Sequence, residues 1–472
     1  MTQPSKPTAR TRPIARRRRH GILDAATRPV DGASLALVRM AAGAVVVLAA
    51  VRTWAYGWTD ALYAGPSHRF TYLGLAWVPQ PGPMGIRVLV AATAAAGAAL
   101  ALGWRTRIAA LVLLVTWGWI EAIDATTYLN HYWFVTLLAA LAVVVPFGTT
   151  WSLDARRRAR RGDDRGDVLA VGWVWLVRAQ VGVVYVFAGL AKLQADWLVR
   201  AEPLRFWLPA RRDLPVVGSL LAAPETAHIA AVAGAAFDCL VVPALLWRRT
   251  RPWAYAAVLG FHLVTWSLFP IGVFPWLMAA CATAFFEPDW PRRLVARWRP
   301  TTTADGAAGT STAAIVRRTA PPRLAALALT AGVAWMAVQV ALPLRHLAYA
   351  GDHRWSGEGY RFGWNVLLTE RVGSVAFEVR DPATGRTWTA DPAELYTPAQ
   401  LRVMPAEADL VHQAAQAIAA HEAAEGHPDV EVRVDAWLSV NGRPPARWID
   451  PTVDLAAAPR TPWHRPWLLP PP

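Results

Sequence analysis

Long apolar segments separated by short polar or basic stretches occupy most of the chain between residues 33 and 342. An apolar run of about 20 residues is long enough to cross the hydrocarbon core of a bilayer as a helix. The pattern therefore predicts a polytopic α-helical membrane protein with about nine transmembrane helices. The nine expected spans are Ala33–Trp54, Met84–Trp104, Ile108–Ile123, Tyr132–Pro146, Leu169–Leu193, His228–Trp247, Trp253–Phe269, Val273–Phe286 and Leu324–Leu342.

The pattern changes after the ninth span. Two alternating runs flank a DPATG turn in Ser374–Thr389, which predicts a β-hairpin. Glu407–Ala424 has helical periodicity, and Val430–Val440 alternates like a strand before an Asn-Gly turn. Residues 344–472 are therefore expected to form a small α+β domain.

Clusters of basic residues predict the orientation. They fall in the tail at Arg16–Arg19 and in loops 104–107, 154–167, 247–251 and 287–323. With nine spans all of these lie on one side, which the positive-inside rule makes cytoplasmic. The C-terminal domain is then extracytoplasmic. The expected parts are a basic cytoplasmic tail (1–30), an eight-span transmembrane domain with the catalytic pocket (31–299), a cytoplasmic linker (300–322), the ninth helix (323–343) and the extracytoplasmic α+β domain (344–472).

Composition narrows the class of protein. With 54% hydrophobic and 17% charged residues, this chain of 472 residues is too apolar for a soluble enzyme. The net charge of +15 comes from arginine clusters between the spans, as topology requires, so no nucleic-acid partner is expected. Cys239 and Cys281 both fall in expected spans, and no carboxylate lies at ligand spacing from the histidines. Neither a disulfide framework nor a metal site is predicted.

Lys192 lies near the end of the fifth span and is one of only two lysines among 48 basic residues, the other being Lys6. Arginine stays protonated, whereas a lysine in a low-dielectric site can lose its proton and act as a base. The alternative is a lysine whose amine reaches the lipid headgroups. Counting back three, four and seven positions gives Gly189, Ala188 and Tyr185, a mostly small face that would admit a flat ligand or another helix.

Three further polar residues fall at the same expected depth. Asn130 and His131 precede the fourth span, and His262 lies in the outer half of the seventh. With the lysine they predict a polar site beneath the C-terminal domain, because ionisable groups within a membrane are costly and mark functional sites. The plainer interpretations are a helix cap for Asn130, a capping or hydrated residue for His131 and a packing histidine for His262. Arg178 is interpreted as structural, paired with a helix carbonyl or with Asp238.

The run VVYVFAGLAKLQADW (Val183–Trp197) resembles the signature of the vitamin K-dependent γ-glutamyl carboxylases, in which a transmembrane helix ends in an AG-x-x-KL-x-ADW sequence. Other stretches follow in the family's order, so the resemblance runs from about residue 25 to the C-terminus. The chain resembles a short bacterial-type member of these HTTM-domain membrane proteins. The other matching stretches are RPVDGASLALVR (Arg28–Arg39), LNHYWF (Leu129–Phe134), FHLVTWSLFPIGVFPW (Phe261–Trp276), EPDWPRRL (Glu287–Leu294), RWSGEGYRFGWNVLL (Arg354–Leu368) and DAWLSVNGRPPARWIDPTVDL (Asp435–Leu455).

The resemblance implies nine spans, an external C-terminal domain and a peptidyl-glutamate 4-carboxylase, which is a carbon–carbon lyase. In this family, oxidation of reduced vitamin K by O2 generates a strong base that removes the γ-proton of a glutamate side chain. The carbanion adds CO2, giving γ-carboxyglutamate and the quinone epoxide. The implied co-substrates are reduced vitamin K or menaquinol, O2 and CO2. The implied partners are a glutamate-containing peptide or protein, a prenylated quinol and the lipid bilayer. The Arg-rich and Ala-rich composition of the chain indicates that this bilayer is a bacterial plasma membrane.

The family's functional residues map onto this sequence individually. Lys192 matches the catalytic lysine, which deprotonates the quinol as a free amine, and His131 matches a residue that assists at the glutamate or its carbanion. Asn130 matches a residue that holds the hydroquinone, and His262 and Tyr185 are assigned to the same cofactor-binding pocket. The aromatic residues of the expected glutamate-binding side are Trp355, Tyr360 and Trp364.

Three departures from the family pattern bear on function. Ala191 stands where animal members carry a second lysine. The family's cross-link between a membrane-domain loop and the external domain cannot form, because both cysteines lie in spans. The chain stops before the long extension that helps animal enzymes to engage protein substrates, which leaves the substrate open. Two alternatives therefore stand beside the carboxylase: a quinol-oxidising membrane enzyme with a different acceptor, and a non-enzymatic transporter or assembly protein.

Overall fold

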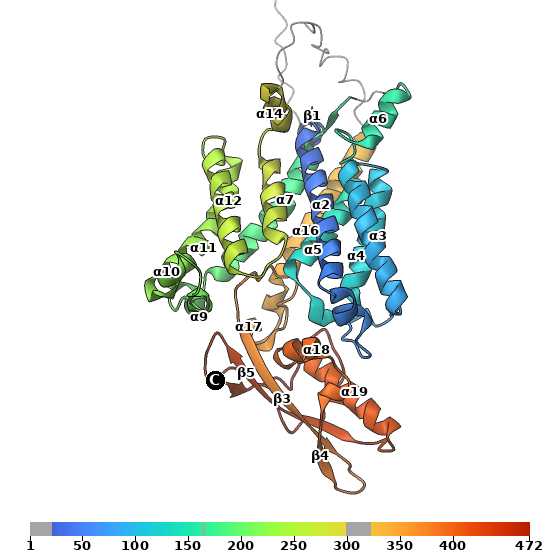
Figure 1. The fold of residues 1–472 in the computed structure, drawn as a ribbon, viewed down its shortest axis with the longest axis vertical. Coiled ribbons are helices and arrows are strands. Elements are labelled where there is room, and N and C mark those ends of the chain that lie inside the picture. Colours follow the sequence, from blue (N-terminus) through green and yellow to red (C-terminus); the bar gives the residue numbers. More distant parts are fainter. Residues whose placement is uncertain (1–20, 164–165, 299–321) are drawn as a thin grey trace, which may run out of the picture.

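The computed structural model describes residues 21–163, 166–298 and 322–472. Arg16–Arg19 and residues 300–321 of the expected linker lie outside the described residues. The helical part of the chain (described residues 21–163, 166–298 and 322–344) consists mostly of helices, and a four-stranded sheet lies in the C-terminal part (residues 345–472) (Figure 1). The chain is therefore mostly helical, with a small sheet near its C-terminus.

Each of the nine apolar segments is helical over most of its length. By length and composition, six helices of the described residues could cross a membrane: α2, α3, α4, α7, α11 and α16. The helices α5, α12 and α13 are not among these six, so the count of nine crossings stays a prediction. The nine helices are α2 (Ala33–Ala55), α3 (Pro83–Leu102), α4 (Thr106–Ile123), α5 (Asn130–Val144), α7 (Val171–Lys192), α11 (Pro224–Leu246), α12 (Arg251–Leu268), α13 (Phe274–Ala282) and α16 (Pro322–Leu344).

Local sequence explains where α3 begins and ends. Pro83 stands in its first turn, and Gly103 ends the helix in the left-handed conformation, with φ at 66°. The buried guanidinium of Arg39 donates to the carbonyls of Leu100 and Ala101 at 2.7 and 2.5 Å. Arg39 thus satisfies carbonyls that a helix end leaves free, which is a structural role.

Shorter elements fill the connections. Strands β1 (Pro29–Asp31) and β2 (Val168–Ala170) pair antiparallel. β1, α6 and α14 lie at the end of the helical part farther from the four-stranded sheet, whereas α9 and α10 lie at the nearer end (Figure 1). The short helices are α1 (Ile22–Ala26), α6 (Leu153–Arg160), α8 (Ala195–Leu198), α9 (Leu204–Trp207), α10 (Gly218–Ala222) and α14 (Trp290–Trp298).

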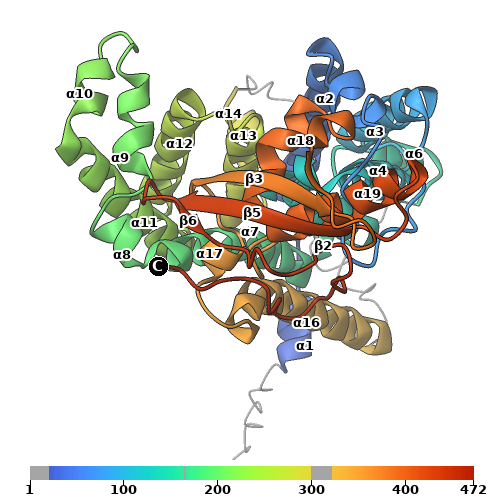
Figure 2. The same ribbon diagram turned by 90° about the horizontal axis from the view of Figure 1, so that it is seen from below.

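The C-terminal part contains an antiparallel sheet with strand order β4-β3-β5-β6, which crosses the ends of the helices (Figure 2). β3 and β4 form the predicted hairpin, with Phe377 opposite Ala390. β5 buries every second residue on the face that packs against α19, as its alternating pattern predicts. The elements are α17 (His353–Ser356), β3 (Arg371–Arg380), β4 (Thr387–Ala390), α18 (Pro398–Val403), α19 (Ala408–Ala424), β5 (Glu431–Val440) and β6 (Ala446–Arg447).

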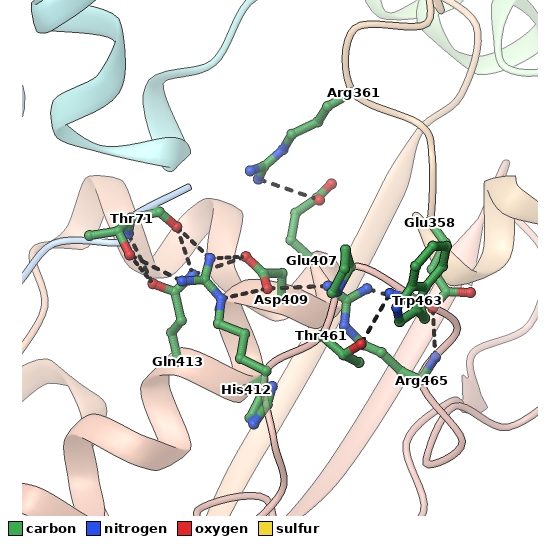
Figure 3. Close-up of polar contacts among 12 residues, drawn as sticks. Thr71, Glu358, Arg361, Glu407, Asp409, His412, Gln413, Thr461, Trp463 and Arg465 are labelled. Atoms are coloured by element: carbon green, nitrogen blue, oxygen red, sulfur yellow. Dashed lines mark hydrogen bonds and ion pairs between the residues drawn. The ribbon is translucent and has the colours of Figure 1, made fainter. Parts of the chain in front are cut away.

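A loop of the helical part docks onto the C-terminal part through a set of hydrogen bonds that we call the polar latch. Gln413 accepts from the backbone N–H of Thr71 at 2.9 Å and donates to its carbonyl at 3.2 Å, as Figure 3 shows. Arg460 donates to the same carbonyl at 2.6 Å, and Gln400 donates to the carbonyl of His68 at 2.8 Å. The polar latch therefore consists of His68, Thr71, Gln400, Gln413 and Arg460.

Candidate functional site

Lys192 is the last residue of α7 and is almost completely buried, with 4% of its surface exposed. Its Nζ lies 2.9 Å from Oδ2 of Asp238 on α11. It also lies 3.2 Å from the carbonyl oxygen of Ala188 and 3.4 Å from that of Val366. The amine therefore does not reach a headgroup layer as a snorkelling lysine would, and it has a carboxylate partner that the sequence interpretation did not assign to it.

Gly189 explains how α11 comes so close to this lysine. A Cβ at position 189 would lie 2.8 Å from Sγ of Cys239 and 3.0 Å from the backbone carbonyl carbon of Asp238, distances that packing does not allow. The sequence analysis allowed either a flat ligand or another helix against the small face of α7, and the structure shows a helix, α11. The sequence could have indicated Asp238 as a site residue, because Asp238 and Glu121 are the only acidic residues within the nine expected spans.

Arg178 has the other structural role that the sequence suggested. Its Nε donates to the carbonyl of Ala284 at 2.7 Å and its Nη2 to that of Phe286 at 2.9 Å. Of the two partners considered, the carbonyl is correct, and Asp238 is left to Lys192.

Residues 362–368 of the C-terminal part reach into the helical part, and we call them the inserted segment. Trp364 is 1% exposed and packs edge-on against Phe134 of α5, with ring centroids 6.1 Å apart. Phe362, Trp364 and Leu367 all have positive φ, at 60°, 58° and 51°. Such non-glycine residues cost of order 1–3 kcal/mol each and persist only where the surroundings enforce them. The surroundings here include Lys192, which contacts the carbonyl of Val366.

Asn130 also contacts the inserted segment. Its Nδ2 donates to the carbonyl of Asn365 at 3.3 Å, and its Oδ1 accepts from the Tyr128 hydroxyl at 2.9 Å. The capping interpretation is not what the structure shows, because Leu129 is the N-cap of α5 and no side chain caps the helix. Adjacent backbone carbonyls of the inserted segment, those of Asn365 and Val366, thus connect Asn130 with Lys192.

His131 is buried beside Asn130, with 9% exposure. Its ring packs against Tyr132 and Phe274, with centroids 4.7 and 5.6 Å away. Its Nε2 has no hydrogen-bond partner among the described residues. A buried polar atom without a partner is rare in a folded protein, so this nitrogen is available to a ligand.

His262 and Tyr185 form a pair of their own. The Tyr185 hydroxyl and Nε2 of His262 are 2.8 Å apart, and the two side chains are buried among Phe237 and Phe261. Tyr185 lies seven residues before Lys192, about 10 Å away along α7 on nearly the same face. The structure therefore places this pair deeper in the helical part than the lysine.

The three aromatic residues expected on the glutamate side lie in different surroundings. Trp364 joins the core of the helical part, whereas Trp355 joins that of the C-terminal part and donates from Nε1 to the carbonyl of Leu469 at 2.8 Å. Tyr360 accepts a hydrogen bond from Nδ2 of Asn365 through its backbone carbonyl at 2.8 Å. Burial raises the pKa of its phenol to about 12, so this hydroxyl is neutral near pH 7. Of the three, Trp364 is the one in the core around the lysine.

Groups that bind metals are sparse in the part of the chain that the structure describes. No cluster of three or more His, Cys, Asp or Glu residues is found there that could hold a metal ion. Cys239 of α11 and Cys281 of α13 are both free thiols.

Comparison with known families gives two matches that together cover most of the chain. The model described as HTTM domain matches residues 27–290. The model described as Vitamin K-dependent gamma-carboxylase, lumenal domain, matches residues 324–472. No solved structure matches the chain. Lys192, Asn130 and His131 lie within the first match and the inserted segment within the second, so the candidate site is built where the two matched regions meet.

Proposed function

Because the chain belongs to the vitamin K-dependent gamma-carboxylase family, we propose that it carboxylates glutamate side chains with CO2 and couples this to epoxidation of a quinol by O2. Its co-substrates are reduced vitamin K or menaquinol, and it acts as a peptidyl-glutamate 4-carboxylase. The quinol supplies the electrons that reduce O2 and thereby the strong base. The protein's own residues bind the reactants, move the first proton and exclude water.

The observation that carries the proposal is the buried pair of Lys192 and Asp238 facing the inserted segment. In the neutral form of this pair the proton sits on Asp238 and the amine has a free electron pair. A neutral pair needs less desolvation than two separate buried charges. The amine can then take a proton from a quinol hydroxyl, as a general base in contact with its substrate must. Lys192 is the catalytic base in this proposal: the pair rests as an ion pair, and the amine gives its proton to Asp238 when the quinol binds.

The neighbouring residues receive roles that fit their contacts. Asn130 is assigned to the quinol, since its amide already bridges Tyr128 and the inserted segment. His131 is assigned to the glutamate or its carbanion, and its free Nε2 supports this. The pair of Tyr185 and His262 is assigned to the deeper wall of the quinol pocket. The remaining assignments, on the glutamate side, are Trp355, Tyr360 and Trp364.

The protein is an integral membrane protein, and we propose that it has nine spans with a cytoplasmic N-terminus and an extracytoplasmic C-terminal domain. The arginine-rich helix α6 and the basic helix α14 lie at the end opposite the four-stranded sheet (Figure 1). The positive-inside rule makes that end cytoplasmic. The candidate site then lies near the extracytoplasmic surface, within reach of an exported peptide and of a quinol that enters from lipid.

The test is incorporation of labelled CO2 into a short glutamate peptide by purified protein in detergent, with quinol and O2. Quinone epoxide is followed in the same tube. Lys192→Ala should lose both products, whereas Lys6→Ala, which removes the only other lysine, should keep both. His131→Ala should lose carboxylation more than epoxidation. Full turnover by Lys192→Ala would overturn the proposed base. Epoxide without label in wild type would favour a different acceptor, and the absence of both products would favour a non-enzymatic role.

A further inference from the structure

A cavity of about 450 Å³ lies between the helical part and the C-terminal part. Tyr128, Trp133, Arg345 and Phe362 are among its lining residues. The Tyr128 hydroxyl accepts from the backbone N–H of Phe362 at 2.8 Å and donates to Oδ1 of Asn130 at 2.9 Å. Tyr128 therefore connects the cavity wall with Asn130 of the candidate site, and the volume of the cavity suits a short peptide segment.

Two of the acidic residues on the cavity wall are fully paired within the C-terminal part. The carboxylate of Glu358, whose side chain is completely buried, accepts from the Arg465 backbone N–H at 2.9 Å and lies 2.7 Å from Nδ1 of His464. Asp409 accepts two hydrogen bonds from Arg460, at 2.9 and 2.7 Å, and one from Arg465 at 3.2 Å. Figure 3 shows Asp409 between its partners and Arg465 beside Glu358. These acids leave no net negative charge on their side of the cavity.

The two remaining arginines of the cavity wall differ in their partners. Arg361 faces Glu407 at 3.5 Å, its nearest carboxylate contact. Arg345 donates to the carbonyl of Arg361 at 2.6 Å and lies over the ring of Phe362, 5.5 Å from its centroid. Among the described residues no carboxylate pairs with Arg345. A partly buried cation without a counter-ion is costly, so its position on a cavity wall points to an anion that binds there.

The other polar groups of the cavity wall already have hydrogen-bond partners. Tyr128 and Tyr349 also line the cavity, and their hydroxyls donate to Oδ1 of Asn130 at 2.9 Å and to the carbonyl of Pro462 at 2.8 Å. The acid on the helical side, Glu121, is hydrogen-bonded by the hydroxyl of Thr136. The guanidinium of Arg345, whose N–H groups hydrogen-bond only to a carbonyl oxygen in the described part of the chain, can therefore still donate to a carboxylate.

We propose that this cavity binds a second carboxylate of the acceptor peptide, so that the protein prefers a target glutamate with acidic neighbours. The inference rests on the proposed function, since it concerns the peptide that the same site modifies. Arg345 is the specificity-determining residue, because it is the lining arginine without a carboxylate partner. It does not touch the reacting atoms, so its loss should change peptide affinity and leave turnover of a neutral peptide unchanged.

Two fluorescent peptides with one glutamate each test the proposal, one flanked by aspartates and one by asparagines. Their binding to the purified full chain is measured by anisotropy at 50 and 500 mM salt, where about 500 mM screens exposed charges strongly. Wild type should bind the aspartate peptide about tenfold tighter, as expected for one charge-assisted contact, and high salt should reduce this preference. Arg345→Gln should lose the preference, and Arg345→Lys should keep most of it. The exposed Arg402 of α18 provides the control, Arg402→Gln, which should behave like wild type.

Equal binding of the two peptides to wild type would overturn the proposal, as would an unchanged preference in Arg345→Gln. If Arg345→Gln does not fold, the salt dependence of wild type and the Arg345→Lys variant decide the outcome. The binding assay needs no turnover. A preference for the aspartate peptide without any incorporation of CO2 would therefore refute the proposed function and keep the anion site, whereas turnover without preference would do the reverse.

Discussion

Replacement of Asp238 by asparagine removes the counter-charge of Lys192 and almost nothing else. The variant keeps the size and shape of the side chain, which is 5% exposed, opposite a lysine side chain that is 6% exposed. The amine retains the carbonyls of Ala188 and Val366, at 3.2 and 3.4 Å, and the ring of Trp197, whose centroid is 5.2 Å away. In Asp238→Asn a protonated lysine is therefore a buried cation without a counter-charge.

The distance between the two groups sets the size of the effect. Two unit charges 2.9 Å apart attract each other by about 6 kcal/mol at an effective dielectric constant of about 20. The carbonyl contacts and local relaxation recover part of this, and removing one member of a buried pair costs about 3–5 kcal/mol. We expect Asp238→Asn and Lys192→Met each to lower the free energy of unfolding by about 3 kcal/mol. The double variant leaves no unpaired charge and should lie within about 1 kcal/mol of wild type.

The assay is a double-mutant cycle on the four proteins, unfolded by denaturant in detergent. The predicted coupling energy is about 3 kcal/mol, far above the ~0.5 kcal/mol within which independent sites add. Quinone epoxide formation, measured on the same samples, should be lost in both single variants and in the double variant. The double variant should therefore regain stability but not activity. Additive losses in the double variant would refute the pairing. A stable Asp238→Asn variant with normal epoxide formation would refute both the pairing and the role of the carboxylate.

Two further predictions concern packing and pH. Gly189→Val should lower the free energy of unfolding by about 1–3 kcal/mol, because the added carbons meet the backbone of α11. It should also reduce epoxidation by moving Asp238 away from the lysine. The control is Gly260→Ala on α12, where a Cβ meets nothing within 4 Å, and equal melting temperatures of the two variants would contradict the prediction. Burial alone would raise the pKa of Asp409, but hydrogen bonds and charge from Arg460 and the charge of Arg465 bring the pKa below its usual value. Its stabilising contribution is then complete above the unfolded-state pKa of about 3.9 and is lost as pH falls through the lower folded-state pKa. The melting temperature of Asp409→Asn should therefore differ from wild type at pH 6, and this difference should shrink as pH falls below about 3.9; a constant difference at every pH would be inconsistent with this assignment.

Periodicity predicted the individual elements well because it records which face of an element is buried. The β3–β4 hairpin, α19 and β5 all lie where alternation or helical spacing placed them. The position of Lys192 at the end of α7 follows in the same way from the length of one apolar run. The position of each element depends on neighbouring residues alone, so the sequence predicts it directly.

Contacts between elements were harder to predict, because they depend on which faces meet. Lys192 and Asp238 are 46 positions apart, and the pairing of α7 with α11 depends on Gly189, which the sequence offered equally to a ligand or a helix. Phe362, Trp364 and Leu367 of the inserted segment have left-handed backbone conformations. A sequence predicts such conformations mainly at Gly, Asn and Asp, so these three could not be expected from residue type. Only the packing of two distant parts of the chain enforces it.

The polar latch joins the helical part and the C-terminal part by hydrogen bonds and not by a covalent bond. A covalent cross-link fixes its partners for the life of the molecule, whereas each hydrogen bond of the latch contributes a net of only about 1 kcal/mol. The hydrogen bonds at Thr71 can therefore break and re-form individually, and thiol reagents leave them unchanged. Because the chain's two cysteines, Cys239 and Cys281, are both free and both lie in the helical part, no disulfide joins the two parts.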